Sequence, residues 1–283
     1  MSTSTPSVQR RILASELRRL RLTHGMTQAE AGAASHLSHD AISRYEGGGS
    51  TPGVNDVRQL LTTYGVQGDR LDELLDLARQ ARRRGRLRGV QGTVWPPLEN
   101  LIALERDASS IQELALVAVP GVLQTERYSR AVLAAGDLGA DVDQHVKARM
   151  ARAAAMFDRA EPPRYWVVMR ESVLDSAVGG AEVMAEQLDH LAAMAHQRHI
   201  TVQVIPNSHG AHPSMSGWFS LMRFDIAPEF GVVYTDYLTG SVYRDEPDEV
   251  ARYADAFERL VAAALPAAQS VEMITRARDA YRT

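Results

Sequence analysis

Residues 27–48, TQAEAGAASHLSHDAISRYEGG, constrain the fold of this chain more than any other stretch. They predict two short helices joined by a tight turn. Thr27 can cap the first helix while Glu30, three residues later, accepts from the cap's own N–H, which is the reciprocal pattern of a capping box. Ser38 is a second capping candidate and opens the next helix. Because two helices this short cross rather than lie antiparallel, the second one is expected to project from the surface.

The second of these helices has an apolar side and a polar side. Its apolar residues, Ala41, Ile42 and Tyr45, are expected to face the core. The polar residues at and after its N-terminus are Ser38, His39, Asp40, Ser43 and Arg44. A projecting helix of this kind has the geometry of one that reads the DNA major groove, where Arg pairs with guanine and Asp accepts from cytosine. An exposed polar helix in an all-helical bundle is the alternative.

The runs LRRLRLTHGMTQAE, SHDAISRYEGG and TPGVNDVRQLLTTYGV resemble the lambda-repressor-like helix-turn-helix of the Xre family, from residue 10 to residue 68. The resemblance implies that Gln28 binds a DNA phosphate. It also implies that His39, Asp40 and Arg44 lie on the helix that reads the major groove. Double-stranded operator DNA is therefore the expected partner of this part of the chain.

The same resemblance implies a structural ion pair between Arg21 and Glu46. Two positions depart from the family pattern, since Ala31 stands where a large aliphatic residue is usual and His36 where glycine is usual. The first change removes buried volume, and the second places a Cβ in a left-handed turn. We therefore expect the first motif helix to be the softest part of this domain.

Length and composition predict two domains, because 283 residues with 45% apolar content are enough for two ordinary cores. The N-terminal domain should be an all-α, five-helix, lambda-repressor-like fold, and the C-terminal one a mixed α/β fold with a small sheet flanked by helices. The expected order is a disordered tail at 1–9, the helix-turn-helix domain at 10–84, a basic linker at 85–97 and a regulatory or dimerisation domain at 98–283.

Charge is distributed unevenly along the chain. Residues 1–92 carry 14 Arg and no Lys against 9 acidic residues, whereas the remainder carries 17 Lys plus Arg against 26 acidic residues. A basic segment attracts phosphates and an acidic one does not, so DNA contact is expected only in the N-terminal part. Within the run RQARRRGRLRG, Arg82, Arg83 and Arg84 are possible phosphate contacts, and a solvated linker is the equal alternative.

The C-terminal part carries a second resemblance, in VPGVLQTERYSRAVL, PPRYWVVMRESVL, ITVQVIPNSHGAHPSMSGWFSLMRF and VVYTDYLTGSVYRDEPDEVARY. These runs resemble the domain of unknown function that follows this helix-turn-helix in actinobacterial regulators of the WhiJ-like type. The resemblance implies a small partner protein, as in antitoxin-like or developmental pairs. A homodimer is also expected, because one recognition helix contacts only half of a two-fold operator. The expected dimer surface is formed by Tyr253, Phe257, Leu260, Val261, Met273, Ile274 and Tyr281.

A small-ligand pocket is the alternative role for the C-terminal domain. Aromatic walls with a few fixed polar groups are typical of such pockets. The candidate residues for it are Trp166, Arg170, Glu171, His209, His212, Trp218 and Tyr234. Core packing of the aromatic residues, and solvent exposure of the loop that carries the two histidines, are the competing interpretation. We favour a partner protein over a metabolite.

Several function classes are not expected. The chain has no cysteine, and it lacks HExxH, GxSxG, phosphate-loop and dinucleotide-binding motifs, so we expect no enzyme activity, metal or cofactor. No signal-type or spanning segment is present, which predicts a cytoplasmic protein without membrane contact. The sequence thus predicts a sequence-specific transcriptional regulator whose C-terminal domain binds a partner or effector, or dimerises. The alternatives are a ligand-sensing repressor and a protein-interaction module that no longer binds DNA.

Overall fold

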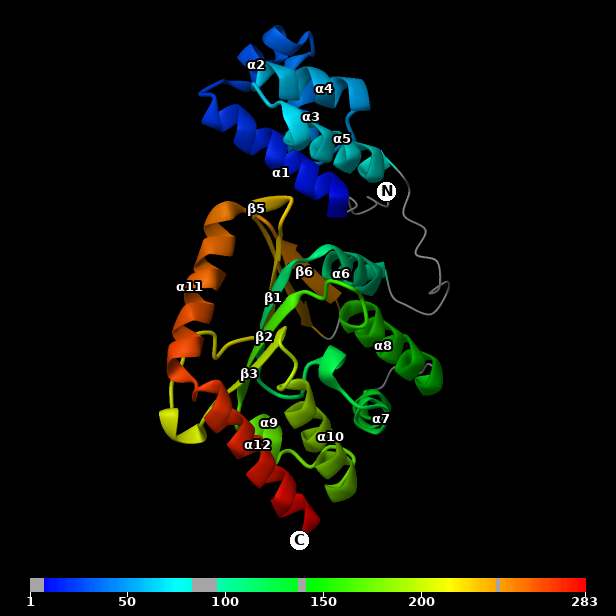
Figure 1. Cartoon of the computed structure of the whole chain (residues 1–283), viewed down its shortest axis with the longest axis vertical. Coiled ribbons are helices and arrows are strands. Elements are labelled where there is room, and N and C mark those ends of the chain that lie inside the picture. The colour runs from blue at the N-terminus through cyan, green and yellow to red at the C-terminus, as the bar shows by residue number, and fades with distance from the viewer. Residues whose placement is uncertain (1–7, 83–95, 137–140, 238–239) are drawn as a thin grey trace. The chain divides into compact units, whose positions relative to one another are not determined.

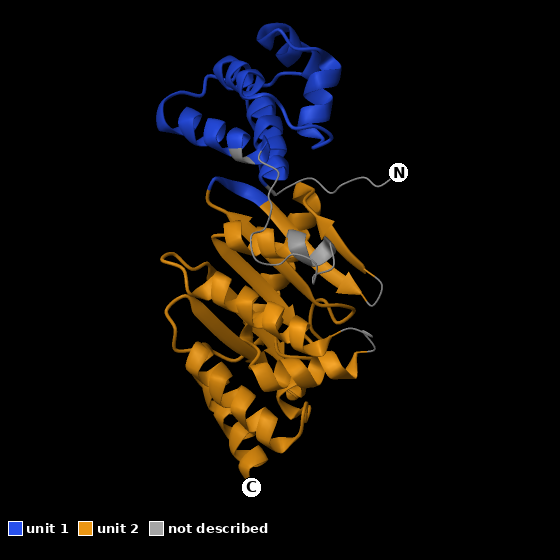
Figure 2. Ribbon diagram, turned by 90° about the vertical axis from the view of Figure 1, so that its right-hand side faces the viewer, with its two compact units in different colours: residues 1–88, 226–230 blue, residues 89–225, 231–283 orange. Residues whose placement is uncertain are grey.

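The computed structural model describes residues 8–82, 96–136, 141–237 and 240–283. The chain divides into two compact units, residues 1–88 with 226–230 and residues 89–225 with 231–283 (Figure 2). The expected tail and basic linker lie outside the described residues, except at their ends. Val8 and Gln9 begin a helix rather than end a tail, and Pro96 and Pro97 begin the helix that was expected from residue 98.

The described part of the first unit consists of five helices, as predicted. They are α1 (Val8–Thr23), α2 (Gln28–Ser35), α3 (His39–Glu46), α4 (Val54–Thr63) and α5 (Gly68–Arg82). Apolar residues recur at helical spacing and meet in one core, where Leu13, Leu17, Ile42 and Leu60 are fully buried. Helix α1 lies against α3 and α5, and α2 contacts α3 and α4 (Figure 1). The core thus holds α3 by one side only.

Both predicted caps of the helix-turn-helix are formed. The Thr27 N–H donates to Oε2 of Glu30 at 2.8 Å, while the Glu30 N–H donates to Oγ1 of Thr27 at 3.2 Å. At the second helix, the Ala41 N–H donates to Oγ of Ser38 at 3.1 Å. These bonds satisfy backbone donors that have no partner inside a helix. Local sequence chemistry therefore sets where α2 and α3 begin.

The turn between α2 and α3 depends on two residues. His36 has φ 57° and ψ 32°, the left-handed conformation predicted for it, and its N–H donates to the Gly32 carbonyl. A Cβ on Gly32 would lie 2.7 Å from the Leu37 carbonyl oxygen, so glycine is required where the turn returns over α2. The turn is consequently tight enough to make the helices cross.

The second unit is built on a mixed six-stranded sheet of order β3-β2-β1-β4-β5-β6. Its strands are β1 (Ser110–Ala115), β2 (Arg164–Arg170), β3 (Ile200–Ile205), β4 (Phe219–Phe224), β5 (Ala227–Tyr237) and β6 (Gly240–Arg244). Strand β1 pairs in parallel with β2 and antiparallel with β4, and β2 pairs in parallel with β3. The predicted α/β fold is confirmed.

Two strand predictions need correction. A strand was expected at 113–119, whereas β1 pairs from Ser110 and ends at Ala115. The apolar run after Ala115 leaves the sheet, and Val117 in it is 78% exposed. Strand β6 was not predicted because it is short and begins with glycine. It is nevertheless held by antiparallel pairing with β5.

Helices cover both faces of the sheet, as Figure 1 shows with α11 on one side and α6 and α8 on the other. The helices described in this unit are α6 (Pro96–Asp107), α7 (Glu126–Ala135), α8 (Val142–Phe157), α9 (Ser172–Asp175), α10 (Ala181–Met194), α11 (Pro247–Ala263) and α12 (Ala267–Arg282). Short 3-10 turns lie at Gly121–Leu123 and Asn207–His209. Helix α12 lies against α10 and strand β3.

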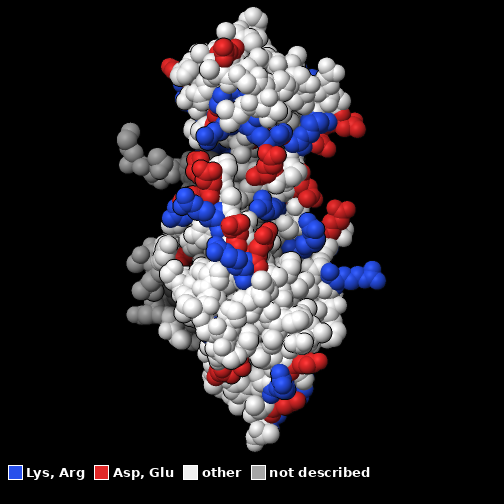
Figure 3. Space-filling model, turned by 90° about the vertical axis from the view of Figure 1, so that its left-hand side faces the viewer, with Lys and Arg blue, Asp and Glu red and all other residues white. Residues whose placement is uncertain are grey.

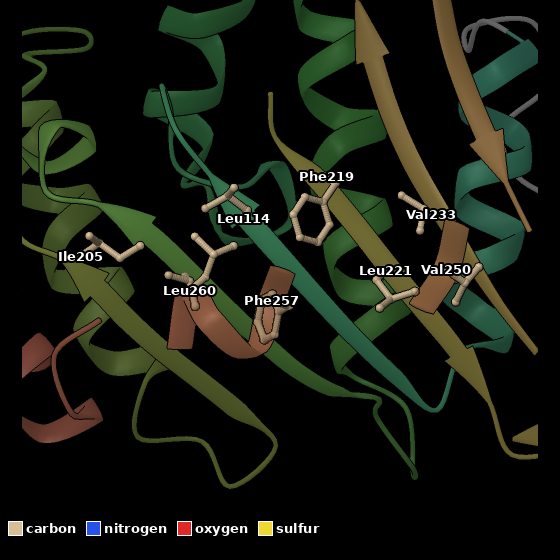
Figure 4. Packing of buried hydrophobic residues seen from close by; sticks show 9 residues of the cluster. Leu114, Ile205, Phe219, Leu221, Val233, Val250, Phe257 and Leu260 are labelled. Carbon is tan, nitrogen blue, oxygen red and sulfur yellow. The ribbon is translucent and has the colours of Figure 1, made fainter. Parts of the chain in front are cut away.

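The main core lies between the sheet and α11 (Figure 4). Phe257 of α11 lies edge-on to Trp166 of β2, with ring centroids 5.8 Å apart, and Phe219 of β4 stacks edge-on against Tyr253. The buried members of this cluster are Leu114, Val168, Ile205, Phe219, Leu221, Val233, Val250, Phe257 and Leu260. Alternate strand residues point to this face, so the intervening residues point to the α6 and α8 side.

Three of the seven residues expected to form a dimer surface on the closing helices are buried inside the second unit. Phe257 and Leu260 are buried against the chain's own sheet, and Ile274 of α12 is fully buried as well. Tyr253 is half-buried on Phe219. On the α11 side of the molecule, basic and acidic side chains are interleaved (Figure 3). An amphipathic helix in a single unit buries its apolar stripe internally, and here the sheet takes that stripe.

Candidate functional site

Helix α3 exposes every residue that was predicted to read DNA. Its apolar residues Ala41 and Ile42 are buried, whereas Tyr45 is only half-buried. The exposed residues are Ser38, His39, Asp40, Ser43 and Arg44. His39 and Asp40 contact each other through Nδ1 and Oδ1 at 3.3 Å. The result is a continuous polar surface on a helix that is fixed from the opposite side.

The predicted ion pair between Arg21 and Glu46 is present and buried. Nε and Nη2 of Arg21 donate to the two carboxylate oxygens of Glu46 at 2.7 and 2.9 Å. Nη1 of Arg21 donates to the Met26 carbonyl at 2.6 Å, which ties α1 to the start of the motif. The hydrogen bond from Glu46 raises the pKa of Arg21. Helices α1 and α3 are thus joined by a bidentate pair.

Gln28, the predicted phosphate ligand, joins this network. Its Nε2 donates to Oε2 of Glu46 at 3.0 Å, and its side chain is half-buried at the first residue of α2. An amide nitrogen carries two hydrogens, so one remains for another acceptor. Glu46 therefore orients Gln28 without using all of its donor capacity.

Tyr45, in the last turn of α3, attaches this helix to α4. Its hydroxyl donates to Oδ2 of Asp56 at 2.6 Å. Burial, together with that hydrogen bond, raises the pKa of Tyr45 to about 12. The hydroxyl remains protonated and continues to donate at any physiological pH. The C-terminal end of α3 is consequently held by Tyr45 as well as by Glu46. Of the predicted basic contacts, Arg82 is exposed at the end of α5, while Arg83 and Arg84 lie outside the described residues.

The second unit contains a cavity of about 550 Å³ on the α6 and α8 side of its sheet. The segment after β1, from Leu116 to Gly121, forms part of the wall. The polar lining residues are Glu105, Glu113, Gln124, His145, Arg149, Arg152, Trp218, Ser220, Tyr234, Asp236, Tyr237 and Ser241. The principal apolar lining residues are Leu101, Ile102, Leu114, Val119, Val132 and Leu133.

One ion pair in the cavity wall is complete. Nε and Nη2 of Arg152 donate to the two carboxylate oxygens of Glu105 at 2.6 and 2.5 Å. Burial disfavours the charged form of Arg152, but the Glu105 carboxylate outweighs burial and raises the pKa of the guanidinium. Both oxygens of Glu105 are therefore occupied by the protein itself.

Glu113 is the second carboxylate of the wall. The Tyr165 hydroxyl donates to its Oε2 at 2.7 Å. Burial raises the pKa of Glu113 to about 7, although Tyr165 and the charge of Arg152 oppose that rise. Near neutral pH the carboxyl is thus divided between its protonated and ionised forms. A buried acid with such a pKa in a concave site is typical of a functional site.

Arg149 is the least compensated charge in the cavity. Its Nη1 donates to Oε1 of Gln124 at 2.7 Å, and within the described ranges it forms no ion pair with a carboxylate. Burial and the neighbouring positive charge of Arg152 lower the pKa of Arg149 to about 10. The guanidinium presents five N–H groups, so it retains donors for a further acceptor.

Neither a metal cluster nor a spanning helix is found in the part of the chain that the structure describes. No three His, Asp or Glu side chains gather there in an arrangement that holds a metal ion. None of the described helices has the length and apolar character needed to cross a bilayer.

Comparison with known families divides the chain in the same way as its fold. Residues 12–74 match a family described as a helix-turn-helix domain. Residues 98–276, more than half of the chain, match a family described as a domain of unknown function (DUF5753). The chain belongs to the DUF5753 family. No curated protein and no solved structure matches it. The helix-turn-helix match supports a DNA-binding regulator, and the exposed face of α3 lies within the matched residues.

Most residues of the pocket predicted for the DUF5753 domain do not line this cavity. Only Trp218 and Tyr234 line the cavity, where their rings meet edge-on at 5.7 Å. Trp166 points to the opposite face of the sheet, where its indole donates to Gln203 at 2.8 Å and its ring contacts Phe257. The alternation of side chains along β2 explains the error, because Tyr165, not Trp166, faces the cavity side.

The remaining predicted pocket residues gather at a different place. Arg170 donates to Oδ1 of Asn207 and to the Gly210 carbonyl, each at 3.2 Å, while Oε2 of Glu171 accepts from the Asn207 N–H at 2.6 Å. His209 is exposed and His212 is half-buried, and neither lines the cavity. These contacts fix the loop that follows β3, so Arg170 and Glu171 have a structural role.

Sequence reasoning missed the charged residues of the DUF5753 cavity. Arg149 and Arg152 are three residues apart on one face of α8, among alanines and methionines, and Glu113 stands in a strand next to apolar neighbours. Charges at positions where the pattern expects apolar residues are a usable signal for a buried polar site. Each of these residues alone reads as an ordinary surface charge, which is why the signal was not recognised.

Proposed function

We propose that this DUF5753 protein is a sequence-specific transcriptional regulator of the Xre-like type that reads its operator with α3. The observation that carries the proposal is the exposed polar side of α3, opposite a side that is fully anchored in the core. Within the described residues the Arg44 side chain forms no hydrogen bond or ion pair that it would have to release before it approaches guanine, and Asp40 is highly exposed beside it. Such side chains pair with base edges in the major groove.

Gln28 supplies the positioning contact in this proposal. One hydrogen of its amide nitrogen is directed to Glu46, and the other is available to a phosphate oxygen. Phosphate contacts fix the register of a protein on DNA without reading sequence. Gln28 is therefore assigned to overall affinity, and Arg44 to base preference.

The DUF5753 domain is assigned a regulatory role in a cytoplasmic protein, without catalysis. Its function in this proposal is to bind a partner or an effector, or to dimerise, as in antitoxin-like or developmental regulators. A dimer suits two-fold operators whose half-sites lie one helical turn apart. Of the surface predicted on the closing helices, Phe257, Leu260 and Ile274 are used internally, which leaves the half-buried Tyr253, Val261, Met273 and Tyr281 for a dimer contact. Sedimentation of the full chain with and without DNA measures directly whether the protein dimerises.

The DNA-reading role is tested by fluorescence anisotropy with the full-length chain. Arg44→Ala should weaken binding to the preferred operator by roughly 1 to 3 kcal/mol. The affinity of this variant for a scrambled duplex should equal that of the parent protein. Gln28→Ala should weaken binding to both duplexes alike. Arg58→Ala is the matched control, since it removes the same charge from an exposed position on α4. Equal behaviour of Arg44→Ala and Arg58→Ala on both duplexes would argue against α3 as the reader.

A protein-interaction module that no longer binds DNA is the rival function. It draws support from the first unit, where several arginines are already paired, among them Arg19 with Glu16 and Arg21 with Glu46. A salt titration separates the two functions. A DNA-binding protein should lose roughly 0.9 log units of affinity per log unit of salt for each phosphate it neutralises. Absence of any measurable DNA binding at low salt would favour the interaction module.

A further inference from the structure

The cavity of the DUF5753 domain has the size and lining of a small-molecule site. Its volume of about 550 Å³ lies within the range of roughly 300 to 1,000 Å³ in which proteins bind small ligands. It is contained entirely within the second unit, between the sheet and helices α6, α7 and α8. The question is which chemistry its walls would recognise.

The three carboxylates of the cavity are already engaged by the protein. Arg152 occupies both oxygens of Glu105, and Tyr165 donates to Glu113. Asp236 accepts hydrogen bonds from Trp218 and Tyr234. A cationic ligand would have to compete with these donors for the same oxygens. The carboxylates of the lining are therefore largely occupied by contacts within the protein.

Arg149, unlike Arg152, is not paired with a carboxylate of the lining among the described residues. Arg149 is oriented by Gln124, which is neutral, and repelled by Arg152, so its charge is stabilised by no carboxylate contact within the described residues. A carboxylate beside Arg149 would accept charge-assisted hydrogen bonds, which are the stronger kind. This geometry favours an anion over a cation.

One hydroxyl group in the wall also lacks a partner among the described residues. Ser220 is 4% exposed, lies opposite Glu113 in the β1–β4 pairing, and its Oγ has no hydrogen-bond partner there. Buried polar groups are nearly always satisfied, so an unsatisfied hydroxyl that lines a cavity indicates a polar group that belongs there.

The remaining lining residues are aliphatic or aromatic, and they favour a ligand with an apolar body. Leu101, Ile102 and Leu133 contribute aliphatic surface, and Trp218 and Tyr234 contribute an aromatic wall. At the cavity rim Val117 is 78% exposed and Tyr237 is 65% exposed. Large apolar side chains exposed beside a concave site are expected where they cover a ligand.

We propose that the cavity binds a small monocarboxylic acid, with its carboxylate at Arg149 and its alkyl or aryl body against the apolar wall. The Ser220 hydroxyl then donates to a further polar atom of the ligand. This function goes beyond DNA recognition and does not depend on it, because the lining residues and the binding measurement belong to the second unit alone.

The test uses the full-length chain and two matched sets of probes in isothermal titration calorimetry. One set is phenylbutanoate, phenylbutanamide and phenylbutylamine, and the other is octanoate, octanamide and octylamine. Each acid should bind about 10-fold or more tightly than its amide, because a hydrogen bond to a charged group adds roughly 1.5 to 3 kcal/mol. Arg149→Gln should abolish that difference and leave amide binding unchanged. Arg127→Gln, on the exposed side of α7, is the matched control.

Three results would overturn the proposal. The first is equal affinity for acid and amide, or tighter binding of the amine. The second is the absence of binding by every probe at millimolar concentration. The third is an acid preference that survives in folded Arg149→Gln protein. Should that variant not fold, Arg149→Lys keeps the positive charge and should keep the acid preference, while the comparison of acid with amide on the parent chain still decides the matter.

Discussion

Glu16 in the first unit and Glu113 in the second are carboxyl groups whose pKa values move in opposite directions. Glu16 is 2% exposed, and although burial raises its pKa, hydrogen bonds from Arg19 and Arg70 outweigh burial and lower it. Those bonds measure 2.8 and 2.7 Å. Glu113 has only the Tyr165 hydroxyl in hydrogen-bond contact, and burial raises its pKa to about 7. The fully buried Glu16 is thus a fixed charge, whereas the half-buried Glu113 is a titrating group.

The arginines of the two units differ in the same sense. Arg21 gives all of its hydrogen bonds to the fold, to Glu46 and to the Met26 carbonyl. Arg149 has one partner, the neutral Gln124. The first unit satisfies its buried polar groups internally and presents its functional residues outside on α3. The DUF5753 domain keeps incompletely satisfied groups inside, which is what a binding cavity requires.

The largest effect is expected from breaking the internal network of the first unit. Arg21→Met leaves Glu46 buried without its ion partner, which costs roughly 3 to 5 kcal/mol. Hydrogen exchange at the amides of α1 and α3 reports this local stability within the full chain. The double variant Arg21→Met/Glu46→Met removes both charges and should recover part of the loss. A single variant as stable as Arg58→Met would show that the pair contributes little.

Glu113→Gln should change the stability less than Arg21→Met does, and it should stabilise the protein rather than destabilise it. The folded pKa of about 7 lies above the ordinary value of 4.5 for a glutamate, so the parent protein loses stability as pH rises through that window and carries the full cost above it. The groups that act on Glu113 are Tyr165, Arg152, Glu105 and Asp236.

Because Glu113 is half-buried rather than fully buried, about 1 to 2 kcal/mol of the roughly 3 kcal/mol implied by the full shift is expected. Glu113→Gln should therefore stabilise the β1 and β2 amides against exchange above neutral pH, with no gain in acid. Glu16→Gln is the matched control, and it should destabilise the first unit at neutral pH. A pH-independent effect of Glu113→Gln would contradict the assignment.

The smallest effect concerns backbone strain in the two units. His36 has φ 57° and Ser214 has φ 60°, both in the left-handed region. His36→Gly should raise stability by about 1 kcal/mol, because glycine adopts this conformation without a Cβ clash. Ser214→Gly should gain less, since the Ser214 hydroxyl also donates to the Gly217 carbonyl at 2.6 Å. Thermal unfolding of the full-length variants measures both changes in stability. A loss of stability in His36→Gly would show that the backbone at His36 is not strained.

The helix-turn-helix was predictable because its determinants are local. Thr27, Glu30 and Ser38 act on backbone groups within three residues, and the left-handed turn at His36 follows from its place between two caps. The pair of Arg21 and Glu46 spans 25 positions and came from the family resemblance rather than from spacing. Short-range chemistry therefore defined the surface on which DNA recognition is proposed.

The cavity was not predictable from the same rules. Its charged residues come from α6, β1, α8 and β5, segments that only the sheet order brings together. The aromatic residues misled the prediction, because Trp166 and Tyr165 are neighbours in sequence yet lie on opposite faces of β2. Aromatic content indicates burial, but it does not say which face of a sheet is open.

Selection of bound sequences from a random DNA library tests the central claim most directly. Full-length protein should enrich one defined motif, and Arg44→Ala should enrich a motif that has lost its preference at a single guanine position in each half-site. Arg58→Ala should enrich the parental motif unchanged. Enrichment of no motif by the parent chain, or of the same motif by Arg44→Ala, would contradict the proposal that α3 reads DNA.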